Sequence, residues 1–167
     1  MQLTHSAISR LRSQHESIPF ILNGMQEPLL RYRPNPQKWS ILEHVAHLAR
    51  YQELMPERIR RLLLEETPAF DRYSAEEDPH FKKWCALDWW VLWSGLVAGR
   101  QALAKLLTDL HPSDLDRTAI HPLYGAIPIP FWVEFFLIHE AHHLYTILQL
   151  VGVIRKEQLE NVQRINK

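Results

Sequence analysis

Two histidines stand four residues apart in the segment 131–150, FWVEFFLIHEAHHLYTILQL, which is otherwise apolar and of helical length. On an α-helix, side chains at positions i and i+4 project from the same side, so His139 and His143 would point the same way. Neutral imidazoles are common ligands of transition metals. The spacing indicates either half of a metal site or two histidines that fill a hydrophobic core.

A rotation of about 100° per residue places this pair inside one apolar face of the helix. Relative to His139, His143 falls at about 40°, whereas His142 falls about 60° to the other side and is a weaker candidate to point inward. A second apolar face lies opposite and contains Leu137, Ala141, Leu144 and Leu148. A helix with two apolar faces is buried against the core and against either a neighbouring helix or a second subunit.

Two histidines do not complete a metal site, because zinc usually takes four ligands and catalytic zinc takes three protein ligands plus water. The stretch SILEHVAHL supplies two further candidates, His44 and His47. Ser40 and Glu43 form the capping-box pattern that starts a helix there. His44 lies nearer the centre of the apolar stripe of this helix and His47 nearer its edge, so periodicity leaves both open as the third ligand.

The letters HEAHH also contain the pattern H-E-x-x-H, in which the glutamate is the general base of metalloproteases. Glu140 falls about 100° from His139, toward the flank of the helix. We therefore expect a solvated or surface-paired carboxylate, with a general base as the less favoured alternative. Glu43 is available for acid–base chemistry, but its place in the capping box explains it better.

Composition limits the class of protein. A chain of 167 residues with 46% hydrophobic and 23% charged residues fits one globular domain spanning 1–167. The 19 basic and 19 acidic residues cancel, which argues against a nucleic-acid partner. No signal-peptide pattern begins the chain, and the longest uncharged apolar run, 89–99, is too short to span a bilayer. The single cysteine, Cys85, is expected to be a buried residue rather than a nucleophile, in a cytoplasmic protein without a membrane partner.

Helical periodicity predicts four long helices. They cover residues 3–25, where Pro19 would bend the helix or end its first part, a stretch after Ser40 that Pro56 kinks or breaks, residues 84–110, and residues 131–150. The proline-rich stretch around 28–36 and the segments 65–83 and 111–130 are expected to be connections without regular structure. The pattern predicts an all-α four-helix bundle with room for crossovers.

Two separated motifs resemble the DinB/YfiT-like family of metal-dependent enzymes. The stretch RYRPNPQKWSILEHVAHL, 31–48, is similar to the signature of the second helix in that family. HPLYG at 121–125, followed by HEAHH at 139–143, is similar to the motif of the last helix. The resemblance covers the chain in order, and it implies a bundle in up-up-down-down order with long crossover connections, commonly a homodimer.

The same resemblance implies a divalent metal ion (nickel, zinc or manganese) held by three histidines. Matched residue by residue, these are His47, His139 and His143, which leaves His44 and His142 as supporting or packing residues. Many relatives continue after the last ligand with a small residue and glutamine, where this chain has Tyr145 and Thr146; Thr146 is expected to line the pocket. No catalytic residue is assigned, and the departure makes transfer of a particular substrate unsafe.

Three neutral imidazoles leave positions on a bound ion open for water or substrate. Members of the family include S-transferases and isomerases that use low-molecular-weight thiols, so the first expectation is a transferase in which a metal-bound thiolate attacks a small-molecule electrophile. The alternatives are hydrolysis by metal-bound hydroxide and a non-catalytic, dimeric binding module. Arg58 could hold a carboxylate of a substrate, but a surface pair with Glu53 or Glu57 is favoured.

Overall fold

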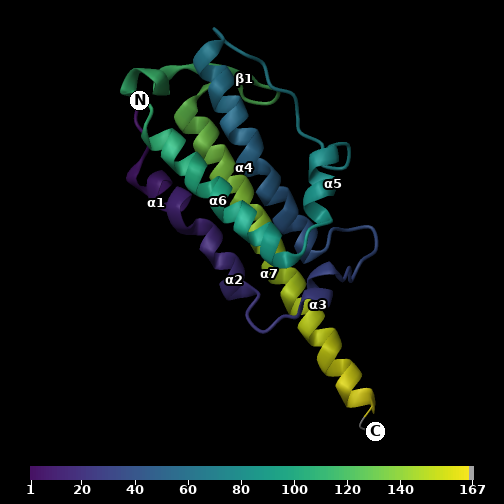
Figure 1. Cartoon of the computed structure of the whole chain (residues 1–167). Helices are drawn as coiled ribbons and strands as arrows, with labels where there is room; N and C mark the ends of the chain where they lie inside the picture. Colours follow the sequence, from purple (N-terminus) through teal and green to yellow (C-terminus); the bar gives the residue numbers. More distant parts are fainter. Residues whose placement is uncertain (166–167) are drawn as a thin grey trace.

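The chain folds into a bundle of long helices with one short β-hairpin at its upper end (Figure 1). The computed structural model describes residues 1–165; Asn166 and Lys167, which the predicted domain includes, lie outside the described residues. The elements are α1 (His5–Ser13), η1 (Gln14–Glu16), α2 (Ser17–Ile21), α3 (Glu27–Arg31), α4 (Ile41–Leu64), α5 (Pro79–Cys85), α6 (Trp89–Thr108), η2 (Pro112–Asp116), β1 (Thr118–His121), β2 (Gly125–Pro128) and α7 (Ile129–Ile165). The prediction of an all-α four-helix bundle is confirmed, and its four members are α1 with α2, α4, α6 and α7.

Contacts between helices define their directions. The informative pairs are Arg10–Glu134 and Gln14–Glu140 for α1 and η1 with α7, His44–His143 and Tyr51–Phe136 for α4 with α7, and Leu11–Arg100 and His15–Trp93 for α1 and η1 with α6. The first and last helices therefore run one way, and α4 and α6 run the other way (Figure 1). The order is down-up-up-down, so the expected up-up-down-down order is wrong. A single crossover, residues 65–88, returns along the bundle between α4 and α6.

The start of α4 matches its sequence signature. The Glu43 amide donates to Ser40 Oγ over 3.3 Å, and the Ser40 amide donates to the Glu43 carboxylate over 2.8 Å. Arg33 forms an ion pair with the same carboxylate. Pro56 does not break the helix, which is continuous from Ile41 to Leu64 with Pro56 buried. The loss of one backbone hydrogen bond is tolerated because both halves of the helix are packed in the core.

The break expected at Pro19 is present: a 3-10 turn separates α1 from α2, where Pro19 has no amide to donate to the carbonyl four residues earlier. Three stretches differ from the prediction. The connection 65–83 contains the start of a short helix, α5, and α6 begins at Trp89 rather than at residue 84. The short helix α3 lies in a stretch expected to be irregular, because Pro28 occupies its first turn, where a helix needs no amide donor. The last helix continues to Ile165, well beyond 131–150.

Two clusters of buried hydrophobic side chains fill the bundle, one toward each end, and α4 contributes to both. Between them lies a buried polar layer formed by Gln52, Arg100 and Glu140. Gly99 allows α6 to approach α4 closely at this level, since a Cβ there would lie 2.6 Å from the Cβ of Gln52. Larger side chains at Gly99 would therefore push the two parallel helices apart.

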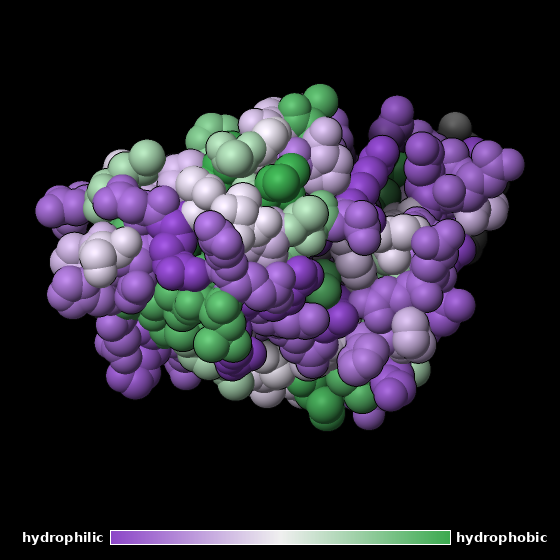
Figure 2. Space-filling model, turned by 90° about the horizontal axis from the view of Figure 1, so that it is seen from above, coloured by the Kyte–Doolittle hydropathy of each residue, from purple (hydrophilic) through white to green (hydrophobic). Residues whose placement is uncertain are grey.

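The connection between α6 and α7 is not irregular throughout. It contains an antiparallel hairpin in which Ala119 pairs with Ile127, and Gly125 adopts a positive φ of 68° at its turn. Seen from above, onto this end of the bundle, the surface carries hydrophobic patches among mainly hydrophilic side chains (Figure 2). Within residues 1–165, none of the helices is both long and apolar enough to cross a membrane.

Candidate metal centre

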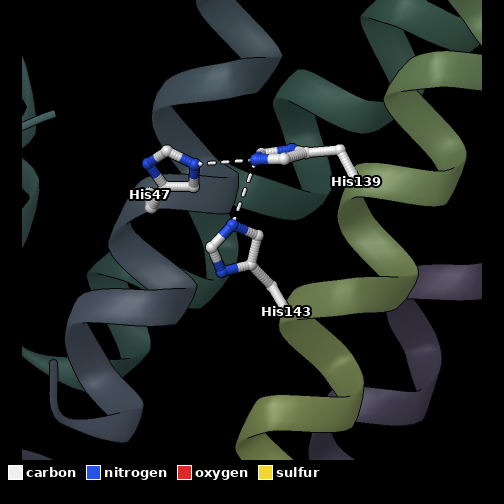
Figure 3. Close-up of side chains that lie close together, drawn as sticks. All are labelled: His47, His139 and His143. Carbon is white, nitrogen blue, oxygen red and sulfur yellow. Dashed lines mark hydrogen bonds between the residues drawn. The ribbon is translucent and has the colours of Figure 1, made fainter. Parts of the chain in front are cut away.

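Three imidazole rings from two antiparallel helices converge at one point inside the bundle (Figure 3). His139 Nε2 lies 3.1 Å from His47 Nε2 and 3.0 Å from His143 Nε2. One nitrogen from each ring can be chosen so that all three lie within 4.8 Å of one another. His47 and His143 are buried and His139 is half-buried, so the cluster is open on one side only. The structure thus brings together the three residues that the family resemblance singled out.

Aromatic side chains pack against these imidazole rings and hold them in position. Trp39, just before the cap of α4, lies 5.0 Å from the His47 ring, centroid to centroid. One turn further along, the Tyr51 ring lies 4.4 Å from that of His139. The rings are therefore held between aromatic side chains before any ligand binds.

Burial keeps the three rings neutral. Burial, together with the neighbouring His139 and His44, lowers the pKa of His47 to about 3. Burial, together with the charges of His142 and Arg58, lowers the pKa of His139 to about 4. The pKa of His143 is also lowered, mainly by burial and then by His139 and His47. A neutral imidazole offers a lone pair, which is the form that binds metal ions.

The donor set fits a divalent transition-metal ion. Zn–N bonds of 2.0–2.1 Å in a tetrahedral site separate the ligand nitrogens by roughly 3.3 Å, close to the two spacings at His139. Three neutral nitrogen donors suit zinc or nickel better than the oxygen-preferring magnesium or calcium. The ring nitrogens of His47 and His139 that face away, both Nδ1, are buried without hydrogen-bond partners in the described chain.

His44 contacts His143 on the side of its ring that points away from the other two histidines. Its Nδ1 lies 2.8 Å from His143 Nδ1, on the opposite side of that ring from the cluster. If Nδ1 of His143 carries the proton and donates to His44, the Nε2 lone pair of His143 points into the cluster, so His44 can fix the tautomer. His142 is exposed and its ring only meets the edge of His143 at 5.4 Å.

Glu140 is the clearest correction to the sequence prediction. Its side chain is fully buried and forms an ion pair with Arg100 of α6, while Gln14 donates to the same carboxylate over 3.0 Å. The expectation of a solvated or surface-paired carboxylate is wrong. The contacts of Glu140 lie toward η1 and α6, whereas His139 faces α4, so Glu140 is not placed as a base for the centre.

A cavity of about 280 Å³ opens beside the centre. Besides His47 and His139, its walls include Tyr51, Arg58, Asp71, Tyr73, His121 and Phe135. Thr146 is not among them, contrary to expectation; its hydroxyl donates to the carbonyl of His142 over 3.0 Å. His121 was visible in the HPLYG motif, but only the hairpin of β1 and β2 places it at the cavity.

The structure also tests the sequence predictions for Cys85 and Arg58. Cys85 is half-buried, and burial raises the pKa of its thiol to about 12, so it stays protonated, in line with its expected role as a packing residue. Arg58 does not pair at the surface as favoured from the sequence. Glu53 binds Arg50 instead, and the Arg58 guanidinium packs over the rings of Phe70 and Trp132.

Comparison with known proteins identifies the family. Residues 10–147 match the DinB superfamily, and the chain belongs to it. Two relatives are a Bacillus subtilis protein named YuaE, 26% identical over 153 residues (83% of this chain and 90% of YuaE), and an Oceanobacillus iheyensis protein named "Putative metal-dependent hydrolase", 29% identical over 112 residues (67% of this chain and 64% of that protein).

Two solved structures share the fold. YfiT from Bacillus subtilis, described as a probable metal-dependent hydrolase with an unusual four-helix bundle topology, superposes with a TM-score of 0.74 at 21% identity, covering 92% of this chain and 90% of YfiT. A protein from Clostridium difficile 630 superposes with a TM-score of 0.64 at 12% identity, covering 93% and 97% of the two chains. At these identities the likeness supports the fold alone.

Proposed function

We propose that this protein is a metal-dependent hydrolase whose divalent ion is held by His47, His139 and His143. The observation that carries the proposal is the convergence of three neutral imidazole nitrogens beside a cavity large enough for a small molecule. The names of the Oceanobacillus relative and of YfiT support the same reaction class. A divalent ion so bound acts as a Lewis acid and lowers the pKa of water, which supplies a nucleophile at neutral pH.

The side chains around the cavity have separate tasks in this proposal. The Tyr51 hydroxyl keeps its proton, because burial raises its pKa, and it can donate to a substrate oxygen. Tyr73 is committed elsewhere, since its hydroxyl donates to Asp78 over 3.0 Å. Phe135 gives the cavity an apolar wall. Asp71 is the one carboxylate among the described residues lining this cavity, so it is our candidate to accept a proton.

Thiol-dependent transfer, which the family resemblance implied, remains a prediction. The same three histidines would serve it, and a low-molecular-weight thiol would take the position of water. A homodimer also remains a prediction. On the second apolar face of α7, Leu137 and Leu144 are buried in the bundle, whereas Leu148 is 52% exposed, so part of that face is free for a subunit contact.

Metal content and activity test the proposal together. The protein, purified without a nickel column, should contain close to one divalent ion per chain by elemental analysis, and His139→Ala should lose it. Aryl esters and amides are then offered with and without EDTA, in parallel with small thiols plus an electrophile. Metal-dependent turnover of the esters or amides supports the hydrolase, turnover only with thiols replaces it by the transferase, and absence of metal in the wild type contradicts both.

A further inference from the structure

We propose that the cavity beside the three histidines binds a carboxylate group of the substrate, with Arg58 as its principal partner. This inference rests on the proposed function and narrows it to small carboxylic acids or their derivatives. The reason is that the lining of the cavity includes a half-buried cation that forms no ion pair with the described residues, together with a second, neutral donor.

Arg58 is a half-buried cation that forms no ion pair with the described residues; its chain neighbour Glu57 raises the pKa of Arg58 less than burial lowers it. Its neighbours on α4 are paired otherwise, since Glu53 binds Arg50 and Arg61 binds Glu65. Among residues 1–165, no carboxylate forms an ion pair with Arg58, whose Nη2 donates only to the backbone carbonyl of Asp71 over 3.2 Å. Burial lowers the pKa of Arg58, which reflects the cost of holding a charge there. A carboxylate in the cavity would offset that cost.

The faces of two aromatic rings hold the guanidinium in place. Its central carbon lies 5.4 Å from the centroid of Phe70 and 5.7 Å from that of Trp132. A planar guanidinium fixed in this way keeps its remaining N–H groups available for two parallel hydrogen bonds to a carboxylate. The preorganised fork loses little freedom on binding, in contrast to a mobile surface arginine.

His121 supplies a second donor on the same wall. The backbone amides of Leu123 and Tyr124 donate to its Nδ1, over 3.0 and 3.3 Å. Because Nδ1 is the acceptor, the proton of the neutral ring is on Nε2. Burial and the charge of Arg58 lower the pKa of His121 and favour this neutral form. The ring packs against Trp132 at 5.3 Å, on the same indole that Arg58 covers.

The charge around the cavity also favours an anion. Among the described residues that line the cavity, two are cationic, Arg58 and Arg72, and one is anionic, Asp71. This balance does not include the charge of a metal ion. At about 280 Å³ the cavity suits a small molecule rather than a peptide. A substrate held by its carboxylate at Arg58 would direct its other end toward His47 and His139, which line the same cavity.

Direct binding tests this inference without relying on catalysis. Benzoate and the uncharged benzamide are titrated into the full-length protein, as isolated and after EDTA treatment, and binding is followed by NMR chemical-shift changes. The wild type should bind benzoate about tenfold or more tightly than benzamide, in both preparations. Arg58→Gln should reduce that preference to near unity, whereas Arg60→Gln, an exposed arginine on the same helix, should leave it unchanged.

The outcomes are distinct from those of the metal experiment. Equal affinity for benzoate and benzamide in the wild type overturns the inference, and so does an unchanged preference in Arg58→Gln. A preference that disappears with EDTA and survives Arg58→Gln means that the carboxylate binds the ion instead, which also overturns it. Arg58→Gln should keep its metal; if that variant does not fold, the benzoate preference of the EDTA-treated wild type decides. Absence of metal in the wild type would remove the proposed hydrolase while leaving the EDTA-treated titration valid.

Discussion

The guanidinium of Arg100 and the carboxylate of Glu140 form an ion pair at the centre of the bundle, with side-chain exposures of 1% and 0%. Arg100 also donates from Nε to Gln52 over 3.0 Å, and its guanidinium lies 5.0 Å from the ring of Phe136. Gln14 donates a further hydrogen bond to Oε1 of this carboxylate over 3.0 Å. The ion pair therefore connects α6 to α7, and its hydrogen bonds to Gln52 and Gln14 connect it to α4 and η1. Glu140 directly follows His139 on α7.

Glu140→Gln should lower the free energy of unfolding by about 3–5 kcal/mol. The substitution keeps the size of the side chain and removes its charge, which leaves the Arg100 cation buried without an anion. Burial already lowers the pKa of Arg100 to about 10, so the cation is held in an unfavourable environment. Urea denaturation followed by circular dichroism measures the change.

Two further variants make this result interpretable. Replacing both partners with methionine should cost less than the sum of the two single replacements, because no lone charge remains. Lys105→Ala breaks an exposed pair with Asp109, whose side chains are 77% and 58% exposed, and should leave the urea midpoint nearly unchanged, because solvent screens such a pair. A Glu140→Gln protein as stable as the Lys105→Ala protein would show that the buried pair does not hold the bundle.

Part of the geometry of the candidate metal centre can be predicted from the sequence, because it depends only on residues close together in the chain. The i, i+4 spacing of His139 and His143 is a property of one helix, and the capping box at Ser40 fixes where the other helix begins. The choice between His44 and His47 was not local. Both lie on the buried side of α4 and both touch the last helix, and only the antiparallel register with α7 decides which ring meets His139.

The errors share a physical origin in partners distant along the chain. Helical periodicity places Glu140 on the flank of an isolated helix, whereas its burial depends on Arg100, 40 residues earlier, on a helix whose direction the periodicity does not specify. The helix order failed for the same reason, since it is set by the path of residues 65–88 rather than by any helix. Arg58 was misassigned because Arg50 takes the acid Glu53 that it was expected to bind.

Removing a bound metal ion should destabilise the wild type and leave the ligand variants unaffected. An ion that binds only the folded chain adds about 2.7 kcal/mol at a hundredfold excess over its dissociation constant. We therefore expect EDTA to lower the melting temperature of the wild type, and added zinc, nickel or manganese to restore it. His47→Ala and His143→Ala should give the same melting temperature with EDTA and with metal.

The matched control is His142→Ala, which removes an exposed imidazole adjacent to the site. It should respond to EDTA and to metal as the wild type does. Calorimetric scans with a metal titration give the comparison, and equal responses of His142→Ala and His143→Ala would contradict the assignment of ligands.

His44→Ala should weaken the metal site without removing it. The loss of the ring that meets His143 Nδ1 at 2.8 Å leaves the tautomer of His143 free, and such outer partners are worth about 10–100-fold in metal affinity. The dissociation constant should rise by this factor in a competition titration with a chelating dye, while the stoichiometry at saturation stays at one ion. Complete loss of the ion would instead make His44 a ligand.

His15 should make the protein less stable in mild acid. It is buried between α1 and α6 beside Trp93, with Nδ1 lacking a partner in the described chain, and burial together with the charge of Arg100 lowers its pKa to about 4. The unfolded chain takes up this proton near pH 6.5 and the folded chain only near pH 4, so the free energy of unfolding falls as the pH drops through that window.

The size of this effect is about 1–2 kcal/mol at pH 5. Urea denaturation of the wild type and of His15→Leu at pH 7 and pH 5 measures it, with both proteins in EDTA. The histidines of the metal centre contribute to the pH dependence of both proteins, so they cancel in the difference. His15→Leu should lose less stability between the two pH values than the wild type does. Equal losses in the two proteins would mean that the pKa of His15 in the folded bundle is close to its value in the unfolded chain.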